Sequence, residues 1–415
     1  MPRLPSVRFL ALAACALLAP RPAAAPQQET ESVGAVAGSE EGAGGWAALR
    51  EDLAAQGVTF EGTFTVDVSG VLGGGVRQRS TTQGLLDLGA GFDLDPLLDW
   101  KGGTAWVEVW TRWGRLLNAD VGDAQGSSNI DAPSQSQVAQ LWFEQWLVPD
   151  RLRVKLGRVE LFDEFAVVNG AGEFLNNGVT YTPSFLSVPS YPQTAWSVGL
   201  YALPTAQSWL SLAVFDGSAQ DGVTTGNHGA GTFVGEAGGD QAIAEAGCQW
   251  PAADGRLPGR LGVGLWHHGA RFDRFAGGTQ SGASGGYALL EQALWREQPG
   301  VADDVQGVDA FVQGGSTDGD VADIQRHAAA GLTWTGMLPE HDADIAGLGA
   351  TMVSFTAAPG AGYTADHELA LEAFYMLQLG EGLSIKPDLQ WIGDPGGDGS
   401  AADAWVATLR FTLAW

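Results

Sequence analysis

Hydrophobic and polar residues alternate one by one near the end of the chain. In the segment 383–391, Ile385 and Leu389 fall on one face of an extended strand, and the polar residues between them fall on the other. The segment 405–415 repeats the pattern after a glycine-rich loop. A period of two residues predicts β-strands. We therefore expect a closing hairpin, whose last strand ends on Trp415 and pairs with the first strand of a barrel.

The same alternation recurs along most of the chain and predicts about sixteen strands. The cleanest one runs from Val58 to Gly70, where valine and phenylalanine alternate with threonine and acidic residues. The others are expected at 86–95, 103–113, 137–148, 151–160, 193–203, 208–216, 241–250, 259–269, 285–295, 306–315, 326–338, 344–355 and 364–378. Strands of about 9–11 residues with one apolar face can cross a membrane when the polar face lines a lumen.

The predicted connections alternate in length. Short ones such as 149–150 and 380–382 are interleaved with long polar ones. The long ones are expected at 71–83, 114–136, 161–192, 217–240, 270–284, 316–325, 356–363 and 393–402. This arrangement is typical of outer-membrane barrels. We predict an all-β fold, a transmembrane antiparallel β-barrel with short periplasmic turns and long extracellular loops, and we expect the loop 161–192 to fold inward.

The residues before the barrel divide into two regions. Residues 1–25 have a positive end, an apolar core and small residues at their close, which predicts a secretory signal peptide. Residues 26–57 begin as a polar, acidic and flexible periplasmic leader, and helical spacing near their end predicts a short N-terminal helix. The barrel domain is then 58–415. Cys248 is the single cysteine after the signal, so we expect no disulfide and an inert buried thiol.

Composition narrows the class of protein further. The formal net charge is −27, which argues against nucleic acid as a partner. The excess of acid fits either a cation-preferring pore or solvated acidic loops, and we favour the loops. After the signal there is no run of about 18 apolar residues, so we expect no transmembrane helix. Abundant glycine and tryptophan suit turns and the aromatic girdles of a membrane barrel, whose partner is outer-membrane lipid.

A series of short motifs follows in order along residues 46–415. It includes Leu98-Asp-Trp-Lys-Gly-Gly-Thr, Leu141-Trp-Phe-Glu-Gln, Val154-Lys-Leu-Gly-Arg-Val, Pro189-Ser-Tyr-Pro, Val214-Phe-Asp-Gly and Lys386-Pro-Asp-Leu-Gln-Trp-Ile-Gly-Asp-Pro-Gly-Gly. Together these segments resemble the OprB-type carbohydrate-selective porins. The resemblance implies an outer-membrane barrel, monomer or homotrimer, that passes mono- and small oligosaccharides by passive diffusion. It also implies a lumen constriction lined by arginine, acidic and aromatic residues.

The strand 104–113 is the best candidate for the lining of this lumen. Its polar face carries Trp106, Glu108, Trp110 and Arg112. Aromatic rings can stack on sugar rings, and charged groups can bond sugar hydroxyls. The resemblance implies that Arg112 contacts sugar, and it places Asp131 where the family carries a glutamate.

Further candidates for the lumen come from other strands and loops. They are Arg115, Glu144, Arg158 and Glu164. The alternative for each of these charged residues is that it is charged only because the lumen is filled with water, without contacting a sugar. Trp142, Trp146, Trp391 and Trp415 are either sugar platforms or girdle anchors, and the girdle is favoured.

Other chemistry is poorly supported by the sequence. The match to G-x-S-x-G at 282–286 lies in a Gly/Ser-rich stretch without the strand–turn–helix context of a hydrolase. Adjacent His267 and His268 point to opposite faces of a strand, and the acidic segments match no calcium loop. We expect no enzyme activity, no cofactor and no metal. A non-selective or cation-preferring porin, and a secreted β-rich carbohydrate-binding protein or hydrolase, remain as alternatives.

Overall fold

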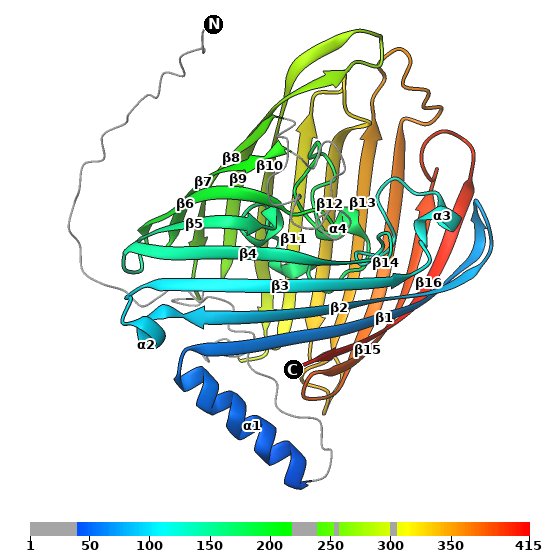
Figure 1. Cartoon of the computed structure of the whole chain (residues 1–415). Coiled ribbons are helices and arrows are strands. Elements are labelled where there is room, and N and C mark those ends of the chain that lie inside the picture. The colour runs from blue at the N-terminus through cyan, green and yellow to red at the C-terminus, as the bar shows by residue number, and fades with distance from the viewer. Residues whose placement is uncertain (1–39, 218–238, 253–256, 299–304) are drawn as a thin grey trace, which may run out of the picture.

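The computed structural model is a closed barrel of sixteen antiparallel strands (Figure 1). It describes residues 40–217, 239–252, 257–298 and 305–415. Each strand pairs with its neighbours along the chain, and β1 pairs with β16 to complete the circle. The predicted all-β barrel is confirmed, and so is the pairing of the last strand with the first.

The strands are β1 Val58–Gly75, β2 Ser80–Asp93, β3 Gly103–Gly114, β4 Gln135–Val148, β5 Leu152–Val159, β6 Ala195–Thr205, β7 Ser208–Asp216, β8 Asp240–Trp250, β9 Gly259–Asp273, β10 Thr279–Arg296, β11 Gly307–Thr317, β12 Ile324–Thr335, β13 Ile345–Phe355, β14 His367–Gly380, β15 Leu383–Gly393 and β16 Ala402–Ala414. The helices are α1 Glu40–Ala55, α2 Leu94–Leu98, α3 Asn118–Val121 and α4 Asn177–Thr180, with short 3-10 turns η1 Leu161–Asp163 and η2 Asn169–Ala171. Each predicted strand has its counterpart among them.

Two predicted loops are much shorter than expected. The connection expected at 71–83 is reduced to 76–79, and the one expected at 270–284 to 274–278. The hairpin of β9 and β10 continues its pairing through Gly/Ser-rich sequence, and the glycine-rich end of β1 pairs with β16, so these strands extend beyond the apolar alternation. The G-x-S-x-G match at 282–286 therefore lies in strand β10 and not in a loop.

The outer face of the barrel is apolar and the inner face is polar. Val68, Leu212 and Leu348 are exposed on the outside, whereas their strand neighbours Asp67 and Ser211 are buried inside. This is the arrangement that a lipid environment requires of a barrel.

Cys248 differs from its prediction. It is exposed, and its cross-strand neighbour Leu261 is exposed as well. The thiol lies on the apolar outer face, because position 248 continues the outward register of Ala242 and Ala246 on β8.

The longest described connections, 115–134 and 160–194, leave from one end of the barrel, and short turns such as 149–151 and 206–207 lie at the other (Figure 1). Helix α1 and the end of β16 lie at the end with the short turns. Among the described residues, no helix is long and apolar enough to cross a membrane. The predicted signal peptide, 1–25, and the leader up to residue 39 lie outside the described residues and stay predictions.

The hydrophobic core lies inside the barrel. The connection 160–194, between β5 and β6, contains the segment expected to fold inward, and its Phe165 and Phe174 are fully buried. They pack against Phe215 on β7 and against Phe311 and Phe374 on β11 and β14. A fully buried phenylalanine contributes about 1.5–3 kcal/mol, so this packing holds the connection to the opposite wall.

A buried ion pair secures the seam between β1 and β16. Arg410 donates from Nε to Asp67 Oδ1 at 2.7 Å and from Nη2 to Oδ2 at 2.8 Å. Both side chains are buried, and Asp67 also accepts a hydrogen bond from Ser128 of the β3–β4 connection.

Asp67→Ala is expected to destabilise the barrel by about 3–5 kcal/mol, because Arg410 would stay buried without its partner. Equilibrium unfolding by urea in lipid vesicles measures the loss. The matched control is Asp67→Leu with Arg410→Met, which removes both charges and should recover most of the stability. A single variant as stable as the unaltered protein would show that the pair does not secure the seam.

Candidate functional site

Two connections fill much of the barrel interior: 115–134 between β3 and β4, and 160–194 between β5 and β6. Their backbone N–H groups are bonded by glutamates of the wall. Ala166 N donates to Glu245 Oε2 at 2.7 Å, and Gly170 N donates to Glu291 Oε2 at 2.9 Å. Hydrogen bonds to a carboxylate are about twice as strong as neutral ones, so these residues fix the path of the second connection.

Two glutamates of β14 each hold a pair of adjacent amides. Glu372 accepts from Leu175 N at 2.5 Å and Asn176 N at 3.0 Å. Glu368 accepts from Ala124 N at 2.7 Å and Gln125 N at 3.0 Å in the other connection. One strand therefore anchors both connections.

The two connections also touch each other. Asn177 N donates to Gly126 O at 2.9 Å, and the Tyr191 hydroxyl donates to Ile130 O at 2.9 Å. Because each connection is bonded to the wall and to the other, together they form one fixed partition inside the barrel.

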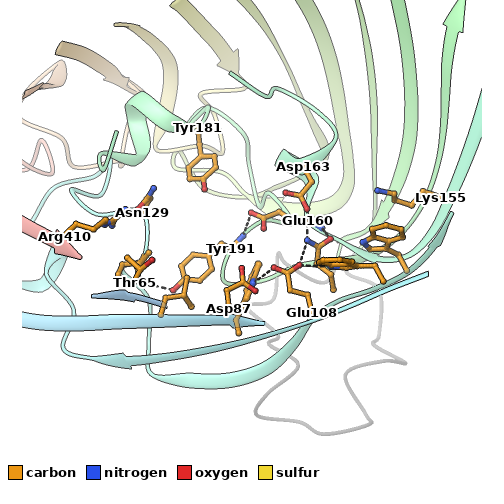
Figure 2. Close-up of a pocket in the computed structure, with 16 residues that line it drawn as sticks. Thr65, Asp87, Glu108, Asn129, Lys155, Glu160, Asp163, Tyr181, Tyr191 and Arg410 are labelled. Atoms are coloured by element: carbon orange, nitrogen blue, oxygen red, sulfur yellow. Dashed lines mark hydrogen bonds between the residues drawn. The ribbon is translucent and has the colours of Figure 1, made fainter. Parts of the chain in front are cut away.

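Between this partition and the wall of β1 to β5 lies a cavity of about 580 Å³, here called the inner cavity (Figure 2). Its lining residues are Thr65, Leu85, Asp87, Trp106, Glu108, Trp110, Asn129, Ile130, Gln140, Trp142, Lys155, Glu160, Asp163, Tyr181, Tyr191 and Arg410. In Figure 2 the wall residues Asp87 and Glu108 face Glu160, Asp163 and the two tyrosines across this space.

Four carboxyl groups face the inner cavity: Asp87, Glu108, Glu160 and Asp163. The Gln140 amide bridges two of them, donating to Glu108 Oε2 at 2.7 Å and to Asp163 Oδ2 at 2.6 Å. Burial raises the pKa of Asp163 well above its usual range, and the nearby carboxylates of Glu160 and Glu108 add to the effect. The cavity is therefore rich in hydrogen-bond acceptors and unfavourable for anions.

Aromatic rings form the other part of the lining. Trp106 stacks on Trp142 with centroids 6.2 Å apart and planes 19° apart. Trp106 Nε1 and Trp110 Nε1 both donate to Glu108, at 3.3 and 2.7 Å. Gly89 lies directly under the Trp106 ring, where a Cβ would overlap it. Glu108 thus fixes the orientation of both indole rings, and Gly89 leaves the space that the Trp106 ring occupies.

Both cations of the inner cavity are paired with acids. Arg410 is bound to Asp67, as described above, and the Lys155 ammonium pairs with Glu164. Lys155 Nζ also lies 4.0 Å from the centroid of the Trp142 ring. Burial opposes ionisation of Glu164, but Lys155 and Arg153 outweigh it and lower the pKa of that carboxyl.

Arg112 and Asp131 are brought together, but not in the inner cavity. Arg112 Nη2 donates to Asp131 Oδ1 at 3.1 Å and to Gln83 Oε1 at 2.6 Å, and its side chain is 1% exposed. Asp131 also accepts from Asn118 N at 2.8 Å. The pair attaches the connection 115–134 to β3. The same connection covers the Arg112 guanidinium, which the sequence analysis expected to face the open lumen.

Five further predicted residues lie inside the barrel, three in the lining of the inner cavity and two in an ion network beside it. Glu108, Trp106 and Trp110 line the inner cavity. Glu144 and Glu164 form an inward-facing ion network with Arg153 and Lys155.

Two predicted lumen residues lie elsewhere. Arg115 is partly exposed beyond the end of β3, where Nη1 pairs with Asp120 Oδ2 at 2.5 Å. Arg158 has the register of Leu156 on β5 and pairs with the exposed Leu141, but Arg158 itself is buried, at 3% exposed. Arg158 is not among the residues that line the inner cavity, and its role in the lumen stays a prediction.

Four tryptophans were expected to be either sugar platforms or girdle anchors, and the structure places two of them inside the barrel and two on its outer face. Trp142 and Trp146 line interior cavities, whereas Trp391 and Trp415 continue the outward registers of β15 and β16. The girdle interpretation fits the second pair only.

Several lining residues are missing from the sequence-based prediction: Asp87, Asn129, Gln140, Lys155, Glu160, Asp163, Tyr181, Tyr191 and Arg410. Alternation alone could have found Asp87, Lys155 and Arg410, since they lie on the polar faces of their strands. The local sequence has no pattern that predicts the lining residues of the two connections. Within the described ranges, no three histidine, cysteine or acidic side chains are grouped so that they could hold a metal ion.

Glu372→Ala is expected to free the connection 160–194 from β14, because two buried backbone N–H groups lose their acceptor. Such a loss costs about 1–3 kcal/mol for each group left unsatisfied. Single-channel recordings should then show a larger and noisier conductance. Glu340→Ala, in an exposed turn between β12 and β13, is the control. An unchanged conductance for Glu372→Ala would mean that the carboxylate does not hold the connection.

Comparison with known proteins gives the family. The model of the family described as "Carbohydrate-selective porin, OprB family" matches residues 77–415. The high-pH structure of Pseudomonas putida OprB is 20% identical, covers 90% of this chain and 98% of its own, and superimposes with a TM-score of 0.80. Salmonella typhi OmpF, in a complex with daunomycin, has a TM-score of 0.59 at 9% identity over 86% of this chain and 97% of its own.

A curated relative matches over a shorter segment. The putative porin QuiX of Acinetobacter baylyi is 25% identical over 131 residues, which cover 29% of this chain and 30% of QuiX. The two structures are too distant in sequence to show more than the fold. The family match covers most of the chain, and it agrees with the closed barrel. The chain therefore belongs to the OprB family of carbohydrate-selective porins and is a β-barrel porin of the outer membrane.

Proposed function

We propose that the inner cavity is the constriction through which neutral mono- and small oligosaccharides diffuse passively. The observation that carries the proposal is the composition of its lining, in which aromatic rings stand beside carboxyl and amide groups. Its volume of about 580 Å³ lies within the range of about 300–1,000 Å³ found for small-molecule sites.

The chemistry of a sugar fits this lining. The apolar face of a pyranose ring can lie on Trp106 or Trp142, and its hydroxyl groups can donate to Glu108 and Asp163. Asn129 and Gln140 add side-chain amides. Binding has to stay weak, since a pore must release what it holds. The family and the fold support a channel rather than an enzyme.

Arg112 and Asp131 then act as positioning residues. They hold the connection 115–134, which carries Asn129 and Ile130 into the lining. Glu144 and Glu164 act in the same way on Lys155. In this proposal none of the four residues has to touch the sugar.

A preference for cations over anions is the second candidate function, and the four carboxyl groups of the inner cavity favour it. Both cations of the lining are already neutralised by acids. The two functions are compatible, because a neutral sugar and a small cation both avoid the repulsion that an anion meets.

Trp106→Ala is expected to weaken sugar binding about threefold to tenfold, because an aromatic contact contributes about 0.5–1.5 kcal/mol. Single-channel current, with glucose and maltose as blockers, measures the change. The matched control is Trp391→Ala, on the outer face. Equal sugar affinity in the Trp106 variant and the unaltered protein would contradict the assignment, and the absence of any sugar block would contradict the proposed function.

Charge selectivity is tested by Glu108→Gln combined with Asp163→Asn. Removing two of the four carboxyl groups should lower the cation preference, measured as the reversal potential across a potassium chloride gradient. Because the pKa of Asp163 is raised, the preference of the unaltered protein should also fall on acidification before ordinary carboxyl groups titrate. Selectivity that is identical in the variant and the unaltered channel would show that these groups do not set it.

A further inference from the structure

A second cavity, of about 840 Å³, continues from the inner cavity toward the end with the short turns. It is called the periplasmic cavity here, since Asp150 and Ala206 of two short turns line it. Trp142 and Lys155 line both cavities. A solute that leaves the inner cavity on this side therefore meets the lining of the second one immediately.

Aromatic rings in the periplasmic cavity are fixed by cations. The Arg153 guanidinium carbon lies 4.1 Å from the ring centroid of Tyr201, and that of Arg260 lies 5.1 Å from the ring of Trp209. Each arginine is held in turn by an acid: Arg153 by Glu164 at 2.7 Å, and Arg260 by a glutamate of β10 at 3.4 Å. The rings are preorganised, and a ligand that reaches them meets the guanidinium groups together with the rings.

Trp209 is the most firmly held of these rings. Its Nε1 donates to Glu245 Oε1 at 2.7 Å, and Glu245 Oε2 accepts from the Tyr287 hydroxyl at 2.6 Å and from Ala166 N at 2.7 Å. The carboxylate that orients Trp209 thus also anchors the inward connection 160–194. The aromatic ring and the partition are positioned by the same group.

The polar lining of this cavity is close to electrically balanced. Its three cations, Arg153, Lys155 and Arg260, face four acids, Glu144, Asp150, Glu164 and Glu245. Ser208, Ser211 and Gln249 add uncharged hydroxyl and amide groups. The inner cavity has four acids and two cations in its lining, so it is the more acidic of the two. The hydroxyl, amide and aromatic groups of the second cavity suit a neutral polyhydroxylated ring.

We propose that the periplasmic cavity is a second binding site for a neutral sugar ring, with Trp209 as its platform. The inference rests on the proposed function of the inner cavity and extends it. Because the two cavities adjoin at Trp142 and Lys155, a disaccharide can place one ring in each. A disaccharide then stays bound longer than a monosaccharide, and it depends on both platforms.

The test uses the full-length protein in planar bilayers, with maltose and glucose as blockers of single-channel current. Trp209→Ala should shorten the residence time of maltose about threefold to tenfold. Trp209→Phe, which keeps a ring, should retain most of it. Trp334→Ala, on the outer face, is the control and should leave it unchanged.

A second variant guards against misfolding of Trp209→Ala. Ser211→Leu narrows the same cavity without removing the bond between Trp209 and Glu245, and it should also shorten maltose residence. If both variants bind maltose like the unaltered protein while Trp106→Ala weakens it, the second site is refuted and the proposed function stands. If the unaltered protein shows no sugar block at all, the proposed function fails as well.

Discussion

Buried backbone amides bonded by wall carboxylates are the interaction on which the rest of this structure depends. A chain segment that folds into a barrel brings polar N–H groups with it, and each must find an acceptor. Glutamates of β8, β10 and β14 supply those acceptors to the two inward connections. Without these acceptors, the buried N–H groups of the connections would be unsatisfied, and the connections would not be stable inside the barrel.

The same requirement explains the layered interior. An apolar cluster attaches the connection 160–194 to the wall opposite β1 to β5. The partition made by the two connections then leaves room on the near side, where the inner cavity lies against β1 to β5. The wall on which the connections pack therefore decides which side chains face the inner cavity, and on the near wall these include tryptophans and carboxyl groups.

The sequence predicts the barrel well and the site only in part. Alternation of apolar and polar residues is local, so it identifies every strand and places Trp106, Glu108 and Trp110 on the inner face. Arg158 has the register of the exposed Leu156 on β5 and is nevertheless buried, so register alone does not give its surroundings. Inner face is not the same as accessible lumen, however. Arg112 has the register of the inner face, but it is covered by the connection 115–134, which follows directly after its own strand.

The lining residues in the connections lie beyond the reach of this reasoning. Glu160, Asp163, Tyr181 and Tyr191 have no periodic neighbours, and their positions follow from contacts with strands far along the chain. Those contacts depend on the path of 160–194 through the interior, which no local pattern encodes.

Hydrogen–deuterium exchange of the amides in 160–194, in the protein reconstituted into lipid nanodiscs, tests the central claim most directly. If wall carboxylates hold this connection, the amides of Leu175 and Asn176 should exchange as slowly as those of the barrel strands. Exchange as fast as in the extracellular connection 356–366 would contradict the account, because the partition would then not be fixed.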